Sequence, residues 1–312
     1  MRRSRPPRRP VFGGPRRCTG RSSGLGHAAV PTGPQGEPLG RSSRYDARPV
    51  PVLDLHNVSV SYDALTTWAL DRLDWTVNAG ERWVVLGPNG SGKTTLVQLI
   101  TGYLHPTHGV LELLDATLGR GVDWRVHRQR VSVVSAAFAR QIRPGLVAAD
   151  VVMTARHGAL ETWWHTYESE DHERARGLLD DAGFGYTADR PFGVLSEGER
   201  QQVQLARSRM RHPELVVLDE PAAGLDLGAR ERLVAQLRAF AVDPSVAAMV
   251  LVTHHVEEVP PGFTHALLLR EGRTVASGVI GDVLTSANVS ATFGLNVDIS
   301  FDRERYAARA TL

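Results

Sequence analysis

The chain has 312 residues but only one cysteine, Cys18. No intrachain disulfide can form, so the fold cannot depend on covalent cross-links, and we expect a reducing compartment. Lysine is equally scarce: Lys93 is the only one, and the other 35 of the 36 basic side chains are arginine. No apolar run approaches the roughly 20 residues that a membrane-spanning helix needs. We therefore expect a protein that can contact a membrane protein but does not cross the membrane itself.

Acidic residues are almost absent from the first part of the chain. Residues 1–48 hold eleven arginines against Glu37 and Asp46, a balance of +9, so the net charge of +2 leaves −7 for the remainder. The same stretch is rich in proline, glycine and serine without apolar periodicity, which predicts a disordered tail and no secretory signal. An extension without function, a transit peptide, and a contact with anionic lipid or nucleic acid remain open for it. The acidic remainder gives no support for a specific nucleic-acid partner.

Strand and helix patterns alternate after the tail. Strand patterns lie at 52–62, 73–77, 82–86, 131–134, 215–218 and 247–253, and a hairpin over 265–283 turns at Glu271 and Gly272 before a short helix. Helical spacing covers 93–102, much of 140–212, and 228–241. Several of the strands are apolar on both faces, which is typical of a parallel sheet covered by helices, so we expect an α/β fold.

The single lysine lies in a glycine-rich segment, between a predicted strand and a predicted helix, that fits the phosphate-binding pattern G-x-x-x-x-G-K-[ST]. This P-loop consists of Gly87, Pro88, Asn89, Gly90, Ser91, Gly92, Lys93, Thr94 and Thr95. Backbone N–H groups of such a loop surround phosphates, and the helix N-terminus adds partial positive charge. Lys93 would reach the β- and γ-phosphates, and the Thr94 hydroxyl would bind Mg²⁺. The segment therefore predicts a nucleotide site.

Two acids follow the buried strand at 215–218. Asp219 would hold Mg²⁺ through water, and Glu220 would act as the general base on the attacking water. Taken alone, two acids after a core strand fit a solvated turn equally well. They follow the P-loop by about 125 residues, and this combination indicates a nucleotide-hydrolysing site.

The pentapeptide LSEGE at 195–199 lies about twenty residues before these acids and begins a predicted helix at 199–210. It resembles the LSGGQ signature of ATP-binding cassette (ABC) ATPases. That resemblance implies that Ser196 and Gly198 contact the γ-phosphate of an ATP bound to a second copy of the chain. Ser196 and Glu199 also fit a helix capping box, and the two roles are compatible.

The resemblance implies an architecture as well. A P-loop domain of ABC type at 51–285 would have a RecA-like parallel sheet core, an antiparallel β subdomain and a helical subdomain at about 137–212. A short C-terminal extension at 286–312 would follow. Two copies would pair head to tail, each ATP lying between the P-loop of one and the signature of the other. Membrane permease subunits would be separate polypeptides, and the chain would be cytoplasmic, peripheral on the cytoplasmic face of the cell membrane.

Three further residues match family positions. Asp226 would lie in the D-loop and contact the opposite site, and His254 would sense the γ-phosphate. Tyr62 would stack on adenine, although a tyrosine at a strand end also fits plain packing. His255 stands where the family commonly has an aspartate, so we assign it no role.

Two positions depart from the family pattern. The Q-loop glutamine, which senses Mg²⁺ and relays to the transport partner in the family, should follow the strand that ends near Ser135. Ala136 stands there instead, so either Gln141 takes the role or the role is lost. Glu197 and Glu199 replace a glycine and a glutamine of the signature. They would repel a γ-phosphate unless they point outward, which is compatible with their place at a helix N-terminus.

Aromatic residues gather within the predicted helical region. They are Trp163, Trp164, His165 and Tyr167. If exposed, they could contact the intracellular helices of a membrane subunit. Packing inside the helical subdomain is equally expected.

These features favour an ATPase that drives separate membrane subunits, with ATP and Mg²⁺ as cofactors. The alternative is a soluble ABC ATPase that acts as a molecular switch, and the missing Q-loop glutamine supports it slightly. A non-hydrolysing relative is disfavoured because Lys93, Asp219, Glu220 and His254 are all present.

Overall fold

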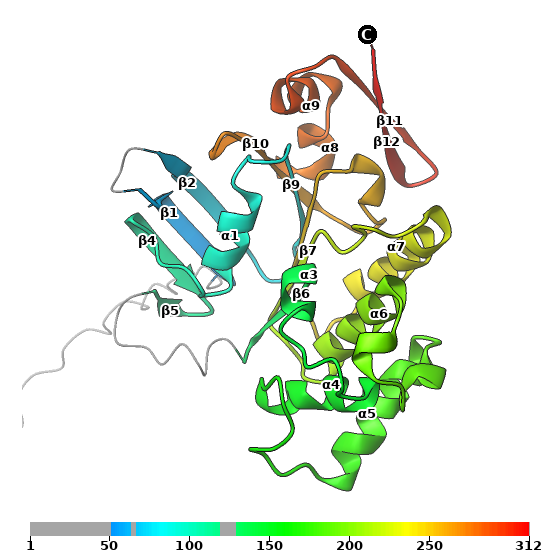
Figure 1. Ribbon diagram of the computed structural model, residues 1–312. Coiled ribbons are helices and arrows are strands. Elements are labelled where there is room, and N and C mark those ends of the chain that lie inside the picture. The colour runs from blue at the N-terminus through cyan, green and yellow to red at the C-terminus, as the bar shows by residue number, and fades with distance from the viewer. Residues whose placement is uncertain (1–50, 64–66, 119–128, 312) are drawn as a thin grey trace, which may run out of the picture. The chain divides into compact units, whose positions relative to one another are not determined.

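The computed structural model describes residues 51–63, 67–118 and 129–311 (Figure 1). The tail expected to be disordered, residues 1–48, lies outside these described residues. In chain order the strands are β1 (Leu53–Ser61), β2 (Trp68–Val77), β3 (Arg82–Leu86), β4 (His108–Leu113), β5 (Ala116–Thr117), β6 (Val131–Ser135), β7 (Leu215–Asp219), β8 (Ala248–Thr253), β9 (His265–Arg270), β10 (Arg273–Val279), β11 (Val297–Asp302) and β12 (Arg305–Ala310). The helices are α1 (Lys93–Ile100), α3 (Ala136–Ala139), α4 (Ala148–Thr154), α5 (Ser169–Asp181), α6 (Glu197–Arg209), α7 (Leu227–Ala241), α8 (Ile280–Val283) and α9 (Ser286–Phe293), with short 3₁₀ turns that include η1 (Ala155–His157) and η4 (Val256–Glu258).

A six-stranded sheet forms the centre, in the order β10-β9-β3-β8-β7-β6. All its neighbouring strands are parallel except the antiparallel pair of β9 and β10. Successive residues of one strand enter different cores: Val216 and Leu218 pack in one cluster, whereas Val217 packs in the other. Because both faces are covered, the central strands are mostly apolar.

The two faces carry different layers (Figure 1). One face packs against α1 and against an antiparallel sheet in the order β2-β1-β4-β5. The other face packs against α7 and the C-terminal elements, with Leu233, Leu237 and Val289 in its core. The predicted fold class is confirmed, with the parallel core and the antiparallel sheet both present.

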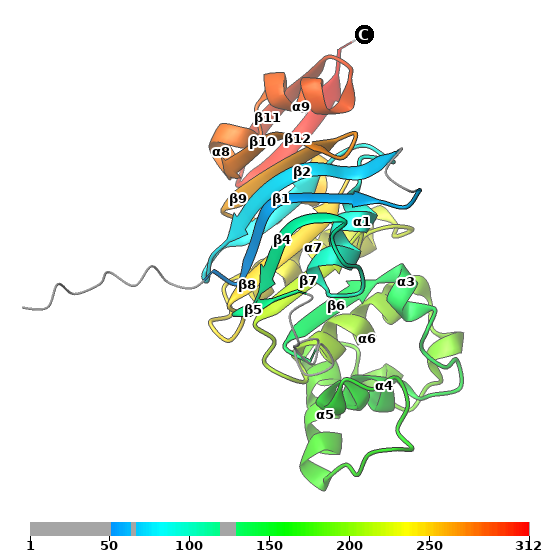
Figure 2. The same cartoon turned by 90° about the vertical axis from the view of Figure 1, so that its left-hand side faces the viewer.

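A third hydrophobic core belongs to the helices α4, α5 and α6, which Figure 2 shows gathered below the central sheet. Val151, Leu179 and Val203 contribute one fully buried side chain from each of these helices. The helix α6 also contacts β6 of the central sheet through a hydrogen bond, since the Ser135 N–H donates to the Gln204 Oε1 at 3.2 Å. This hydrogen bond connects the signature helix α6 to the strand that precedes Ala136.

The sequence patterns did not predict the strands β4, β5, β11 and β12. The strand β4 buries only two of its six residues, so it lacks a clear two-residue alternation. The hairpin of β11 and β12 pairs only within itself in the described part of the chain, and its turn consists of charged residues. Its inner side chains Ile299, Tyr306 and Ala308 pack against the same core as α7.

Across the described ranges, every helix is too short or too polar to pass through a bilayer.

Arg82 links the sheet to the end of α7. Its side chain is 5% exposed, and its guanidinium donates to the carbonyl oxygens of Ala241 at 2.8 Å and Val246 at 2.9 Å, with three longer bonds to neighbouring carbonyls. Arg82→Ala removes all these donors and leaves buried carbonyls without partners. We predict a loss of about 3 kcal/mol in the free energy of unfolding, measured by urea denaturation.

Arg232, exposed on α7, provides the matched control. Arg232→Ala should change the free energy of unfolding by less than about 0.5 kcal/mol. Equal losses for the two variants would show that the buried hydrogen bonds of Arg82 do not stabilise this junction.

Candidate functional site

The P-loop leaves β3 at Leu86 and enters α1 at Lys93, as the sequence predicts. Glycine is required at two positions of this loop, because a Cβ there would clash with neighbouring backbone or would strain the backbone conformation. A Cβ on Gly87 would clash with the carbonyl oxygen of Leu269, and one on Gly92, which has φ of +100°, would clash with the carbonyl oxygen of Ala69. The loop can therefore curl tightly between β2 and the turn after β9.

Lys93 is held at the start of α1 with its side chain only 6% exposed. Its Nζ donates to the carbonyl oxygens of Gly87 at 2.8 Å and Pro88 at 3.0 Å, and it lies 3.8 Å from the Glu220 Oε1. Burial lowers the pKa of Lys93, whereas the nearby carboxylates oppose that change. The ammonium is thus placed on the inner side of the loop, where phosphates would lie.

Asp219 ends β7, beside β8 in the sheet. Burial and the neighbouring Glu220 raise its pKa to about 6, and Lys93 works against that shift. The next residue, Glu220, has φ of +48°, a conformation that is uncommon for a residue with a side chain. Such strain persists where the surrounding structure imposes it, and it is concentrated at functional sites.

Glu220 and His254 meet at the ends of β7 and β8. The Glu220 Oε1 lies 3.2 Å from the His254 Nδ1, and the Glu220 N–H donates to the carbonyl oxygen of Val252 at 2.8 Å. A hollow of about 480 Å³ lies over the P-loop, and a second of about 270 Å³ lies by His254 and the D-loop segment. Glu220 lines both hollows, so it stands where a water beside bound phosphate could be activated.

The larger hollow collects most of the residues that the sequence assigned to phosphate and metal. It is lined by Ala69, Asn89, Gly90, Gly92, Lys93, Thr94, Thr95, Ala136, Ala137, Arg140, Asp219, Glu220 and Ala223. The sequence patterns did not identify Arg140 as a lining residue. The one available signal was its position shortly after the strand that ends at Ser135.

The Q-loop position is occupied by the short helix α3. Its first residue, Ala136, lines the P-loop hollow, and the Ser135 Oγ caps it by accepting from the Phe138 N–H at 3.0 Å. Among the described lining residues of this hollow, Gln141 does not occur, whereas Arg140 does. The segment therefore presents a guanidinium side chain near the phosphate site.

The signature begins α6. The predicted capping box is confirmed, since the Ser196 Oγ accepts from the Glu199 N–H at 3.3 Å and the Glu199 carboxylate accepts from the Ser196 N–H at 2.7 Å. Arg190 also donates to Glu199 at 2.7 Å. The carboxylate of Glu199 is thus engaged within its own chain, and Glu197 lies 3.7 Å from Arg200.

Ser196, Gly198 and Asp226 do not occur among the described residues that line the P-loop hollow. Gly198 instead faces Leu225 of the D-loop segment, and Asp226 caps α7 by accepting from the Ala229 N–H at 2.7 Å. Within one chain, the described signature residues therefore do not contribute to the P-loop hollow.

Tyr62 follows β1 and lies beside the first turns of α1. Its hydroxyl is 3.3 Å from the Thr95 Oγ1 and 3.4 Å from the Gln98 Oε1. The residue is 64% exposed, so its ring is open to a planar ligand next to the P-loop. Its role in adenine stacking stays a prediction.

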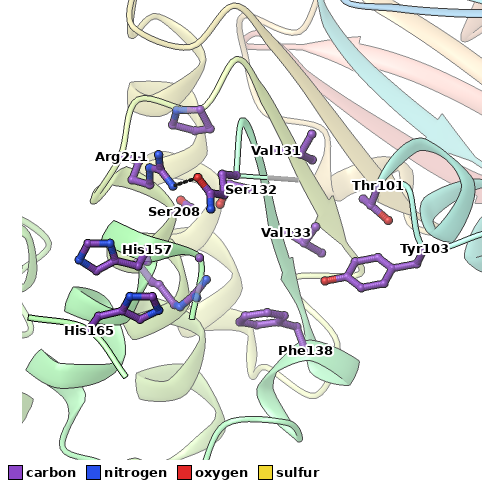
Figure 3. Close-up of a pocket in the computed structure, with 15 residues that line it drawn as sticks. Thr101, Tyr103, Val131, Ser132, Val133, Phe138, His157, His165, Ser208 and Arg211 are labelled. Carbon is purple, nitrogen blue, oxygen red and sulfur yellow. Dashed lines mark hydrogen bonds between the residues drawn. The ribbon is translucent and has the colours of Figure 1, made fainter. Parts of the chain in front are cut away.

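A separate cavity of about 600 Å³ lies between the end of α1, the strand β6 and the helical region (Figure 3). Its lining includes the basic side chains His157, His165, Arg207 and Arg211, and the described lining contains no carboxylate. Arg207 is 9% exposed and lies 4.7 Å over the Phe138 ring. Burial lowers the pKa of Arg207 to about 10.

The aromatic cluster of the helical region divides into two parts. Trp163 and Trp164 are 66% and 83% exposed, whereas Tyr167 packs against the core of the helices. His165 lines the cavity, and its ring stacks on the ring of His157 with the two centroids 4.4 Å apart. The two tryptophans are thus exposed and Tyr167 packs inside the helical region, while the contact with a membrane subunit stays a prediction.

Comparisons with known proteins agree with these features. The family model for ABC transporters matches residues 70–223. The uncharacterized ABC transporter ATP-binding protein YlmA of Bacillus subtilis is 35% identical over 254 residues, which cover 81% of this chain and 95% of YlmA. The cobalt import ATP-binding protein CbiO of Rhodobacter capsulatus is 33% identical over 247 residues, 76% of this chain and 84% of CbiO. Both relatives are named as ATP-binding proteins of transport systems. The alternative of a soluble ABC ATPase acting as a molecular switch is therefore not favoured.

A solved dimeric ATP-binding cassette, in a post-hydrolysis state bound to ADP and phosphate, has the same fold. Its TM-score is 0.64 at 23% identity, over 73% of this chain and 98% of that one. At this identity the likeness concerns the fold alone.

Lys93→Ala tests the P-loop. We predict that ATP affinity, measured by isothermal titration calorimetry, falls by at least about 100-fold because the only buried ammonium at the loop is removed. Lys93→Arg should also weaken binding, since a planar guanidinium does not fit the space of a compact, buried ammonium. Arg232→Ala serves as the control and should leave the affinity unchanged. Unchanged affinity in Lys93→Ala would place the nucleotide elsewhere.

Proposed function

Because the chain belongs to the family of ABC transporter ATP-binding proteins and is an ATP-hydrolysing, nucleotide-binding subunit, we propose that two copies pair head to tail and close around ATP. Each ATP lies between the P-loop of one copy and the Ser196–Gly198 segment of the other. One observation carries this proposal: within a single chain, the signature contributes no described residue to the P-loop hollow. A second copy would supply the missing wall.

The residues act in sequence around the γ-phosphate. Lys93 and the P-loop N–H groups hold the β- and γ-phosphates, and Tyr62 stacks on the adenine. Glu220 accepts the proton of the attacking water, while His254, 3.2 Å away, orients the carboxylate and contacts the γ-phosphate. Asp226 contacts the opposite copy. Release of phosphate and ADP lets the two copies separate.

The donor set of the hollow fits Mg²⁺. The Thr94 hydroxyl and the Asp219 carboxylate line the same hollow and are hard oxygen ligands. The described residues contain no cluster of three or more His, Cys, Asp or Glu able to hold a metal, and Mg²⁺ is commonly held by one or two protein ligands plus phosphates and water. When bound, it would neutralise phosphate charge. Thr94 and Asp219 would orient it toward the β- and γ-phosphates.

Glu220→Gln tests the assigned base. The amide cannot accept the proton, so we predict that ATP hydrolysis falls by more than about 100-fold while ATP still binds. Size-exclusion chromatography with ATP should then show a persistent dimer. Glu112→Gln, which changes an exposed acid on β4, should behave like the unmodified chain. Hydrolysis that survives in Glu220→Gln would assign the base to another residue.

The partner would be a separate membrane subunit, with this chain on the cytoplasmic face of the cell membrane. We assign the contact to the 600 Å³ cavity and the exposed loop with Trp163 and Trp164 beside it. The described lining of the cavity offers basic side chains and no carboxylate, so an acidic segment of the membrane subunit complements it. The exposed tryptophans supply apolar contact area around that charge.

Trp164→Ala tests this contact. In pull-downs of the tagged chain from membranes of its native cells, we predict that recovery of a multi-span membrane protein falls at least about tenfold. Tyr186→Ala, which removes another exposed aromatic side chain of the helical region, should not change recovery. Equal recovery with both variants would exclude this loop from the interface.

A further inference from the structure

The C-terminal hairpin of β11 and β12 contacts two segments that are far apart in the sequence. Arg305, the first residue of β12, donates from Nη1 to the Glu231 Oε2 at 2.9 Å and from Nη2 to the Glu231 Oε1 at 3.4 Å. The same Nη2 donates to the carbonyl oxygen of Glu257 at 2.6 Å. One guanidinium therefore joins α7 to the turn η4.

Each of the two segments that Arg305 joins starts next to a candidate site residue. The helix α7 is capped by Asp226, five residues before Glu231. The turn η4 follows His254 after one residue, and the Glu257 Oε1 accepts from the Ala308 N–H at 3.1 Å. The hairpin thus contacts both the D-loop helix and the segment that carries His254.

Other contacts keep the hairpin in place. Ile299, Tyr306 and Ala308 pack against the core that contains Val256 and Leu233. At the hairpin turn, Glu304 lies 2.9 Å from Arg238 of α7. The Arg305 guanidinium, together with its own hydrogen bonds to Glu231, lowers the pKa of that carboxyl group.

We infer that Arg305 is a positioning residue for ATP hydrolysis. By binding Glu231 and the Glu257 carbonyl together, it fixes the D-loop helix relative to the His254 segment, so Asp226 and His254 keep one mutual arrangement when two copies close. A planar guanidinium suits this task because it can bond two oxygens of a carboxylate and a third acceptor at once. This inference rests on the proposed function, because both segments act in the composite ATP site.

Steady-state ATP hydrolysis by the purified full chain tests the inference. Arg305→Ala should lower kcat about tenfold and change KM for ATP by less than about twofold, because the P-loop is untouched and only the alignment of the hydrolytic groups is lost. Arg309→Ala, which removes an exposed arginine from the same strand, is the matched control and should leave both constants unchanged. A normal kcat in Arg305→Ala would overturn the inference.

Exchanging the charges of Arg305 and Glu231 distinguishes a positioning role of Arg305 from a general effect on stability. The double variant Arg305→Glu with Glu231→Arg restores the ion pair between hairpin and α7, so its kcat should exceed that of Arg305→Glu alone by about threefold or more. No recovery, or a kcat loss in Arg305→Ala that follows a fall in melting temperature, would overturn the inference.

Lys93→Ala is assayed in parallel. An unmodified chain no more active than Lys93→Ala would refute the proposed function itself, whereas a clear difference between them with normal Arg305→Ala would refute only the role of Arg305.

Discussion

Parallel pairing of β3, β8 and β7 brings three chemically different chain segments to one edge of the central sheet. In this register Leu86 lies opposite Thr253, and Asp219 lies opposite Val252. The residues that follow these strand ends are the P-loop, Glu220 and His254, so they emerge side by side. A slip of one residue would turn each side chain to the opposite face of the sheet. The buried, two-faced packing of these strands therefore sets the geometry of the site.

Charge burial is the second feature of this edge. Lys93 is buried, and its pKa is lowered, while the pKa of the adjacent Asp219 is raised. Each ion is costly to bury alone, and their mutual attraction offsets part of that cost. Bound phosphate and a divalent cation would add further partners of opposite sign. The site is thus arranged for a highly charged ligand rather than for a neutral one.

Much of the site could be predicted because its signals are local. The P-loop, the acids after β7 and His254 after β8 each follow an apolar strand, and the fold class was predicted correctly from the alternation of elements and the family resemblance. Arg140 could not be assigned, because nothing in the sequence shows that a short helix replaces the Q-loop. The link from Arg305 to Glu231 and Glu257 spans 74 and 48 residues. Contacts between residues so far apart in the sequence depend on how the whole domain packs, and they leave no periodic pattern in the sequence.

We propose that the ATP site is shared between two copies, and complementation of two inactive variants is the decisive test. Lys93→Ala lacks the P-loop ammonium, and Ser196→Arg blocks the signature, so neither variant alone should hydrolyse ATP. When the two are mixed, a mixed dimer contains one site with an intact P-loop and an intact signature. We expect the mixture to recover ATP hydrolysis. A mixture that exchanges subunits but remains as inactive as its components would contradict a site shared between copies.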